Sequence, residues 1–186
     1  MRNFFKNTAK WILPLSLVIV LVFGTVGTVS AAEFPNGETI PAGETIEDDV
    51  FIGGENVVVD GTVNGMLFAG GTSITINGTI NGDALLMGEM VVVSDSAVIN
   101  GNLFIAGGDL TMNGKVTGSV FSGSAELNVG SMAEVSRNFY YGGFSLKTGD
   151  GSKVGRDLFA AGFQTLLSGD IERDLSVAAA AIELDG

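Results

Sequence analysis

Residues 61–82 read GTVNGMLFAGGTSITINGTING, and the opening pentapeptide returns 17 residues later with a single Val-to-Ile change. The period runs from about Thr45 to the last residue, with steps of 17 residues interrupted by three steps of 19. Each longer step can be absorbed in the turn before an anchor residue, at 94–97, 131–134 and 150–153. Stacked coils tolerate insertions confined to one corner, because neighbouring coils keep their register elsewhere. The anchors are Ile46, Val63, Ile80, Ile99, Val116, Val135, Val154 and Ile171.

Other columns repeat with the anchor. An apolar residue lies four positions after it, then usually an aromatic residue, then in most coils a pair of small residues. A period-two segment such as Ile74-Thr75-Ile76 closes the coil, with one side chain in and the next out. The pattern predicts about eight coils over residues 45–186, with 33–44 as an N-terminal lead-in or cap.

Asn-Gly between apolar runs ordinarily indicates a β-hairpin, so an antiparallel meander is the competing interpretation. Asn77-Gly78 and Asn81-Gly82 are separated by two residues only, too few for a hairpin strand but enough for a short face between two corners. Parallel stacking also gives every column a neighbour of its own kind at about 4.8 Å. The spacing therefore favours an all-β parallel β-solenoid.

Residues 1–32 have the organisation of an export signal. Arg2, Lys6 and Lys10 precede an apolar stretch from Trp11 to Phe23, and small residues at 29–32 offer a cleavage site. The alternative is an uncleaved membrane anchor over residues 11–32. We expect an exported protein, extracellular or associated with the cell envelope. Because the chain has no cysteine, it has neither a lipobox nor disulfides.

Charge narrows the choice of partner. Removal of the leader leaves six Lys and Arg against 21 Asp and Glu, a net charge of −15. Such acidity disfavours nucleic acid and favours solubility of an elongated molecule. A calcium-dependent role is the alternative, although no known calcium-loop motif is present. Its oxygen donors would be Glu47, Asp48, Asp49, Asp60, Asp95, Asp150 and Asp185.

The residues of catalysis are scarce. With no histidine and no cysteine, the chain lacks an imidazole base, a thiol nucleophile and an ordinary zinc site, and we predict no cofactor, no metal and no enzymatic activity. The remaining enzymatic option is polysaccharide cleavage by Asp109 and Glu126, which fall in one column on successive coils, about 5 Å apart. Alternatively, both are solvated residues beside an exposed strand.

Two segments, 61–71 (GTVNGMLFAGG) and 101–114 (GNLFIAGGDLTMNG), resemble the coils of bactofilins, the polymer-forming cytoskeletal proteins of bacteria. The resemblance covers about residues 43–186. It implies a three-faced, right-handed β-helix that assembles end to end into nucleotide-free filaments, often at a membrane. Typical bactofilins are cytoplasmic with short polar tails, so an exported chain is closer to the secreted bactofilin-like proteins.

These observations predict a structural scaffold of the cell envelope that self-associates through its coil ends. The second hypothesis is a solenoid that does not polymerise and displays a face for cell-wall glycan or adhesion. Across these hypotheses, the expected partners of the protein are copies of itself, with a membrane or cell-wall glycan as further options. A polysaccharide-active enzyme is the third and remotest hypothesis.

An aromatic column is the first candidate surface. Strict alternation after the polar residues that precede it would place the rings outside, as a stripe for lateral, membrane or glycan contact. A corner that breaks the alternation would instead place them in the core. The column comprises Phe51, Phe68, Phe104, Phe121, Tyr140 and Phe159.

A charge ladder is the second candidate surface. In one corner column the first coil carries Asp48, the middle coils carry glycine, and the last three carry Arg137, Arg156 and Arg173. Stacking the last coil of one molecule on the first coil of the next would place Arg173 one coil from Asp48, with Asp49 and Asp174 beside them. The alternatives are ordinary solvated corners and a joint between like ends.

Overall fold

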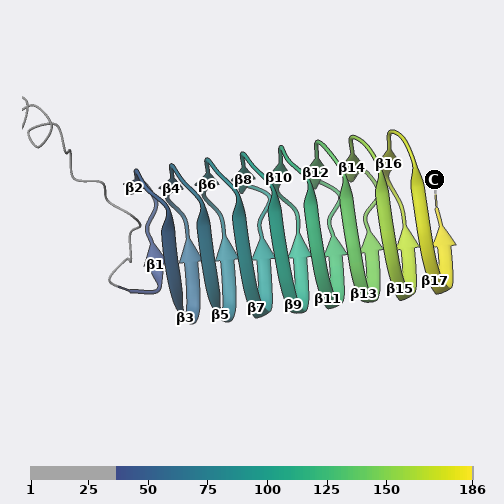
Figure 1. Cartoon of the computed structure of the whole chain (residues 1–186), viewed down its shortest axis with the longest axis horizontal. Coiled ribbons are helices and arrows are strands. Elements are labelled where there is room, and N and C mark those ends of the chain that lie inside the picture. The colour runs from purple at the N-terminus through teal and green to yellow at the C-terminus, as the bar shows by residue number, and fades with distance from the viewer. Residues whose placement is uncertain (1–36, 186) are drawn as a thin grey trace, which may run out of the picture. The chain divides into compact units, whose positions relative to one another are not determined.

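The computed structural model describes residues 37–185, which form an all-β solenoid (Figure 1). The chain divides into two units, residues 1–31 and 32–186, and the solenoid belongs to the second. The predicted leader and the alternative anchor over residues 11–32 lie outside the described residues. Within residues 37–185 no helix is long and apolar enough to cross a bilayer.

Each full coil consists of one two-residue strand followed by one ten-residue strand. The short strands are β1 (Thr39–Ile40), β2 (Thr45–Ile46), β4 (Thr62–Val63), β6 (Thr79–Ile80), β8 (Val98–Ile99), β10 (Lys115–Val116), β12 (Glu134–Val135), β14 (Lys153–Val154) and β16 (Asp170–Ile171). The long strands are β3 (Val50–Val59), β5 (Leu67–Ile76), β7 (Ala84–Val93), β9 (Leu103–Met112), β11 (Val120–Val129), β13 (Phe139–Thr148), β15 (Leu158–Leu167) and β17 (Leu175–Leu184).

Successive coils pair in parallel throughout. The long strands and β1 form a nine-stranded sheet, and the other short strands form an eight-stranded sheet, both in chain order. The register follows the repeat, so Val50 lies beside Leu67 and Ile46 beside Val63. β1 pairs with the end of β3 and adds a partial turn before the eight coils expected from the sequence.

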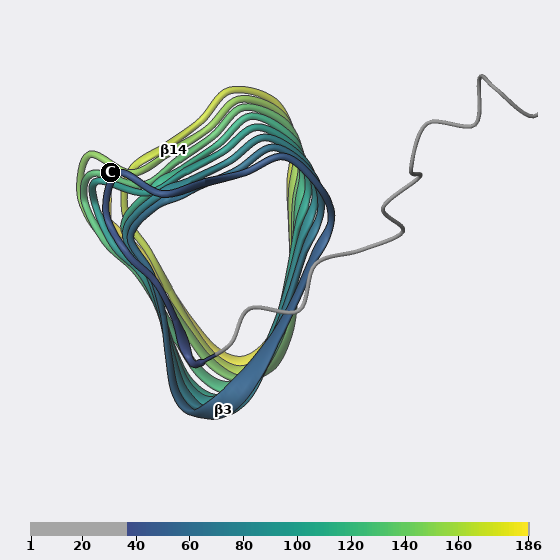
Figure 2. The ribbon, with the colours of Figure 1, turned by 90° about the vertical axis from the view of Figure 1, so that its left-hand side faces the viewer.

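Each long strand bends in the middle and supplies two of three faces. In β3 the side chains at positions 50, 52, 57 and 59 are buried, so the alternation shifts between residues 53 and 56. The short strand supplies the third face, and the end-on view is three-sided (Figure 2). Seen from the N-terminal end, the chain winds clockwise as it recedes, which makes the helix right-handed.

All three insertions lie in the corner before the short strand, as expected. Four of the eight corners that precede the short strands β2 to β16 have two residues, whereas residues 41–44, 94–97, 130–133 and 149–152 provide four. Each insertion closes a turn in which the last residue donates its N–H to the carbonyl of the first, as from Ala97 to Ser94 at 3.0 Å. The extra residues therefore leave the sheets in register.

The core is a set of stacked apolar columns. The anchors from Ile46 to Val154 and the residues four positions later, from Val50 to Leu158, are all buried. Full burial of such a side chain stabilises the fold by about 1.5–3 kcal/mol. Tyr141 is the largest residue of its inward-facing column. Its neighbours in the coils before and after it are the small residues Ser122 and Ala160, which leave room for the ring. Burial raises the pKa of its phenol, which donates a hydrogen bond to the Ser145 carbonyl at 2.8 Å.

Glycine is required where successive coils approach closely. A Cβ at Gly78 would collide with the backbone of Asp60 and Gly61 in the preceding coil, whereas a Cβ at Gly70 would meet nothing within 4 Å. Only glycine therefore fits at the second position of the two-residue corner, which Gly78 occupies.

We expect Gly78→Ala to lower the free energy of unfolding by about 1–3 kcal/mol, because two backbones must separate to admit the methyl group. The matched control, Gly70→Ala, should change it by less than about 0.5 kcal/mol. Urea unfolding followed by far-UV circular dichroism would measure both. Equal stability of the two variants would contradict the close approach of the coils.

Candidate interaction surfaces

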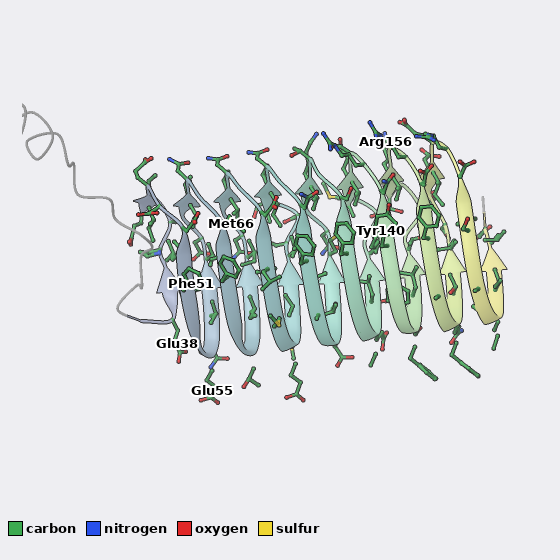
Figure 3. The ribbon with its side chains drawn as sticks, in the orientation of Figure 1. Glu38, Phe51, Glu55, Met66, Tyr140 and Arg156 are labelled. Atoms are coloured by element: carbon green, nitrogen blue, oxygen red, sulfur yellow. The ribbon has the colours of Figure 1, made fainter. Side chains whose placement is uncertain are left out.

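The aromatic column faces outward, so the first of the two orientations considered above is the one observed. Neighbouring rings stack along the solenoid, with centroids 4.5 Å apart for Phe51 and Phe68 and 4.9 Å apart for Phe104 and Phe121. Tyr140 and Phe159 continue the stack at 4.9 and 5.2 Å, and interplanar angles do not exceed 10°. Leu85 takes the place of a ring in the third coil. We call Phe51, Phe68, Leu85, Phe104, Phe121, Tyr140 and Phe159 the ridge (Figure 3).

Stacking determines which part of each ring is available. A ring between two parallel neighbours presents its edge to a partner, because both of its faces are covered. Carbohydrate recognition by aromatic residues uses the ring face, as cation–π contacts also do. Phe121 and Tyr140, which each lie between two rings, therefore offer edges and not platforms for sugar rings.

A groove runs beside the ridge. Two residues after each ridge residue, on the same outer face, comes a residue of the floor column, which is glycine or alanine in all but one coil. The groove comprises two hollows of about 660 and 460 Å³ that share Leu85 and Met87. Sequence reasoning noticed the paired small residues but not the groove. The floor column is Gly53, Gly70, Met87, Ala106, Gly123, Gly142, Ala161 and Ala178.

Within residues 37–185, the last coil has one side that no other coil covers. Inward-facing Leu175, Ile182 and Leu184 of β17 are 40%, 50% and 63% exposed, although their columns are buried in the interior coils. The backbone edge of β17 that faces away from β15 has no further strand among the described residues. This end combines exposed apolar side chains with an unpaired strand edge.

The N-terminal end is partly covered. β1 pairs with Val58 and Val59 of β3, and the Glu38 carboxylate accepts the N–H groups of Glu55 and Asn56, both at 3.0 Å. These backbone donors hold the pKa of Glu38 below its usual value. The edge of the second half of β3 is therefore already hydrogen-bonded within the chain.

The charge ladder lies in one corner column, as the repeat requires. Arg173 Nε is 3.5 Å from Asp157 of the preceding coil, and Asp157 also accepts the N–H of Asp174 at 3.3 Å. At the other end Asp48 accepts the N–H of Asp49, and Asp49 accepts that of Met66. The four residues of the proposed head-to-tail joint thus occupy opposite ends of the solenoid, each in contacts within its own molecule.

A ladder of amide side chains on the neighbouring outward column was not anticipated. Asn64 donates to Glu47 at 2.8 Å, Asn81 to Asn64 at 2.6 Å, and Asn100 to Asn81 at 2.7 Å. The signal was present in the sequence, because these residues recur at the repeat period. Such a ladder stabilises stacked coils, since each amide satisfies its neighbour.

Asp109 and Glu126 lie side by side in adjacent strands, as their shared position in the repeat predicts. Both are exposed, and Glu126 accepts a hydrogen bond from Asn128 at 3.1 Å. Neither residue lines the groove. The pair has the adjacency expected of it but lies outside the hollows beside the ridge.

The acidic residues considered for calcium do not converge. Among residues 37–185, no group of three or more acidic side chains is placed to hold a metal ion. Glu47, Asp48 and Asp49 instead accept separate hydrogen bonds.

Comparison of the chain with protein-family models, curated proteins and solved structures finds no match.

Protonation of Glu38 should loosen the N-terminal end. The pKa of Glu38 is lower in the folded protein than its ordinary value. The contribution of the carboxylate to stability is therefore present at pH values above the ordinary carboxyl pKa, and it is lost as the pH falls through the lowered pKa. We expect the amide protection factors of Glu55 and Asn56 to fall over that range, as measured by hydrogen exchange. Glu38→Gln should reduce them already at neutral pH and remove the pH response.

Glu89→Gln is the control, because Glu89 lies in the same corner column as Glu55, two coils along. Its pH response should match that of the unaltered chain. An unchanged response in Glu38→Gln would show that another group protects these amides.

Proposed function

We propose that this protein is a structural scaffold whose solenoids join end to end. The observation that supports the proposal is that Leu175, Ile182 and Leu184, whose columns are buried in the interior coils, are exposed in the last coil that the structure describes. Covering their exposed parts would contribute about 2–4 kcal/mol. Pairing of the open edge of β17, a ten-residue strand, would supply the rest of the association energy.

The two ends differ, and the difference favours a joint between C-terminal ends. Glu38 and β1 already occupy part of the N-terminal edge, so a head-to-tail joint would have to displace them or use the remaining edge. A joint between two last coils would displace none of the contacts that the structure shows within residues 37–185. A two-fold axis perpendicular to the solenoid would pair one face of β17 antiparallel with the same face of its copy.

The proposed location is the cell envelope. Its support is the sequence of residues 1–32, with basic residues, an apolar stretch and small residues in the order of an export signal. The resemblance of the coils to bactofilins supports a polymeric role. Self-association of this kind requires no nucleotide, metal or catalytic residue.

Charge at the last coil should abolish end-to-end association. We expect Ile182→Lys/Leu184→Lys to convert end-to-end dimers to single solenoids, because each lysine would be forced against the partner's apolar columns. Glu183→Lys is the matched control, since it places lysine on the outward side of the same strand. Negative-stain microscopy and sedimentation velocity would compare them. A wild-type chain without end-to-end joints would refute the proposal.

Asp48→Arg separates the two kinds of joint. In a joint between C-terminal ends, Asp48 is remote from the contact, and association should be unchanged. In a head-to-tail joint it would face Arg173, so the substitution should weaken association at low salt and less at high salt. Sedimentation at two ionic strengths would distinguish these outcomes.

A further inference from the structure

The ridge and the floor column fit each other in size. In most coils a large ridge residue precedes a small floor residue, as with Phe68 and Gly70 or Phe121 and Gly123. The third coil reverses the order of size, with the smaller Leu85 on the ridge and the only bulky floor residue, Met87, which is 53% exposed. A face with a ridge beside a groove, and with a change in one compensated in the other, is complementary to a copy of itself.

We propose that two copies of this chain pair side by side through this face, parallel and with equivalent coils in register. A two-fold axis parallel to the solenoid places the ridge of each copy over the floor column of the other. A two-fold axis across the face would instead place ridge on ridge and leave both grooves empty. Only the parallel arrangement therefore fills the two hollows with the ridge of the partner.

The third coil sets the register. With equivalent coils opposed, Leu85 of each copy lies over Met87 of the other, and in the other coils of the ridge an aromatic ring lies over glycine or alanine. A shift by one coil would place Phe68 or Phe104 against Met87 and leave Leu85 over a small residue. That shift would combine a clash with a void, and packed interfaces tolerate neither.

The axial spacing favours a second copy over other partners. Ridge residues recur once per coil, with ring centroids 4.5–5.2 Å apart, so a partner meets every coil alike only if it has the same spacing. Another copy of the solenoid has it. Eight coils at roughly 4.8 Å and four residues at roughly 3.3 Å give a footprint of about 500 Å² per partner, at the small end of specific interfaces.

This surface is separate from the coil ends, so lateral pairing stands independently of the end-to-end joint. Because the chain carries a net charge of −12, paired copies repel one another. An apolar contact between like-charged molecules should strengthen with added salt, whereas attraction between opposite charges would weaken. The direction of the salt effect is therefore diagnostic.

A size exchange tests the fit. Gly123→Met should weaken lateral pairing by about tenfold or more, because its side chain fills the groove where the partner's Phe121 lies. A Cβ at Gly123 meets only the Gly142 carbonyl, at 3.8 Å, so the solenoid can accept it. Adding Phe121→Leu recreates the Leu85–Met87 pair two coils further along the same face and should restore pairing to within about threefold. Asn128→Met, on another face of β11, is the control.

The measurements use the chain as a bacterial host exports it, in the wild type and in the Ile182→Lys/Leu184→Lys background that removes end joints. Sedimentation equilibrium gives the dissociation constant of the pair. Circular dichroism verifies that each variant is folded. Failure of lateral pairing is thereby distinguished from failure of the end-to-end joint.

Spin labels determine the orientation, since the chain has no cysteine of its own. Cysteines at Asn56 and Gln164, in the first and seventh coils, should each give one inter-copy distance, and the two should be equal in a parallel, in-register pair. In a joint between C-terminal ends, the distance at position 56 would exceed that at 164 by about 58 Å.

Equal label distances, loss of pairing in Gly123→Met and its recovery in the double variant are the expected results. Unequal distances, or a double variant that pairs no better than Gly123→Met, would overturn the proposal. So would a monomeric chain that binds vesicles of phosphatidylglycerol and phosphatidylcholine through the ridge, because lipid would then cover the face.

Discussion

Parallel backbone pairing between successive coils is the constraint on which the other features depend. Each residue of a long strand lies beside its equivalent one coil away, at about 4.8 Å. Side chains therefore meet their own kind, and each column must consist of residues that tolerate a like neighbour. Aliphatic residues satisfy this inside, where they form a continuous core. Rings and amides satisfy it outside, by stacking and by mutual hydrogen bonds.

Charged residues fit this constraint poorly, and the structure deals with them locally. Lys115 pairs with Glu134 of the next coil at 2.9 Å, which alternates the sign within one column. Asp49 and Asp83 direct a carboxylate oxygen to a backbone N–H of the following coil, so the charge is used as an acceptor at a corner. The acidity of the chain is thus spread over corners and outer columns and does not form a metal site among the described residues.

The period, the parallel pairing and the corner of the insertions could be predicted, because each depends only on the spacing of residues. The direction of the aromatic column could not, since the long strand bends between residues 53 and 56 and the alternation shifts there. A bend before Phe51 would have turned the rings inward. The groove could not be predicted for a related reason: the repeated pairs of small residues do not show that the first of each pair, such as Gly70, lies on the outer face beside the rings. The coverage of the coil ends depends on side-chain contacts such as that of Glu38, which no periodicity reports.

A uniform period has a consequence for assembly. The end of the solenoid and its lateral face both repeat the same spacing, so a second copy has the spacing that each of the two proposed contacts requires. A lateral contact of about 500 Å² is weak between two single solenoids. If solenoids joined at their ends and also paired side by side, two end-joined dimers would make two lateral contacts, and the effective concentration at the second contact would strengthen the assembly. In that arrangement, a small groove lined by glycine and alanine would have a large effect on whether end-joined solenoids remain single or form pairs.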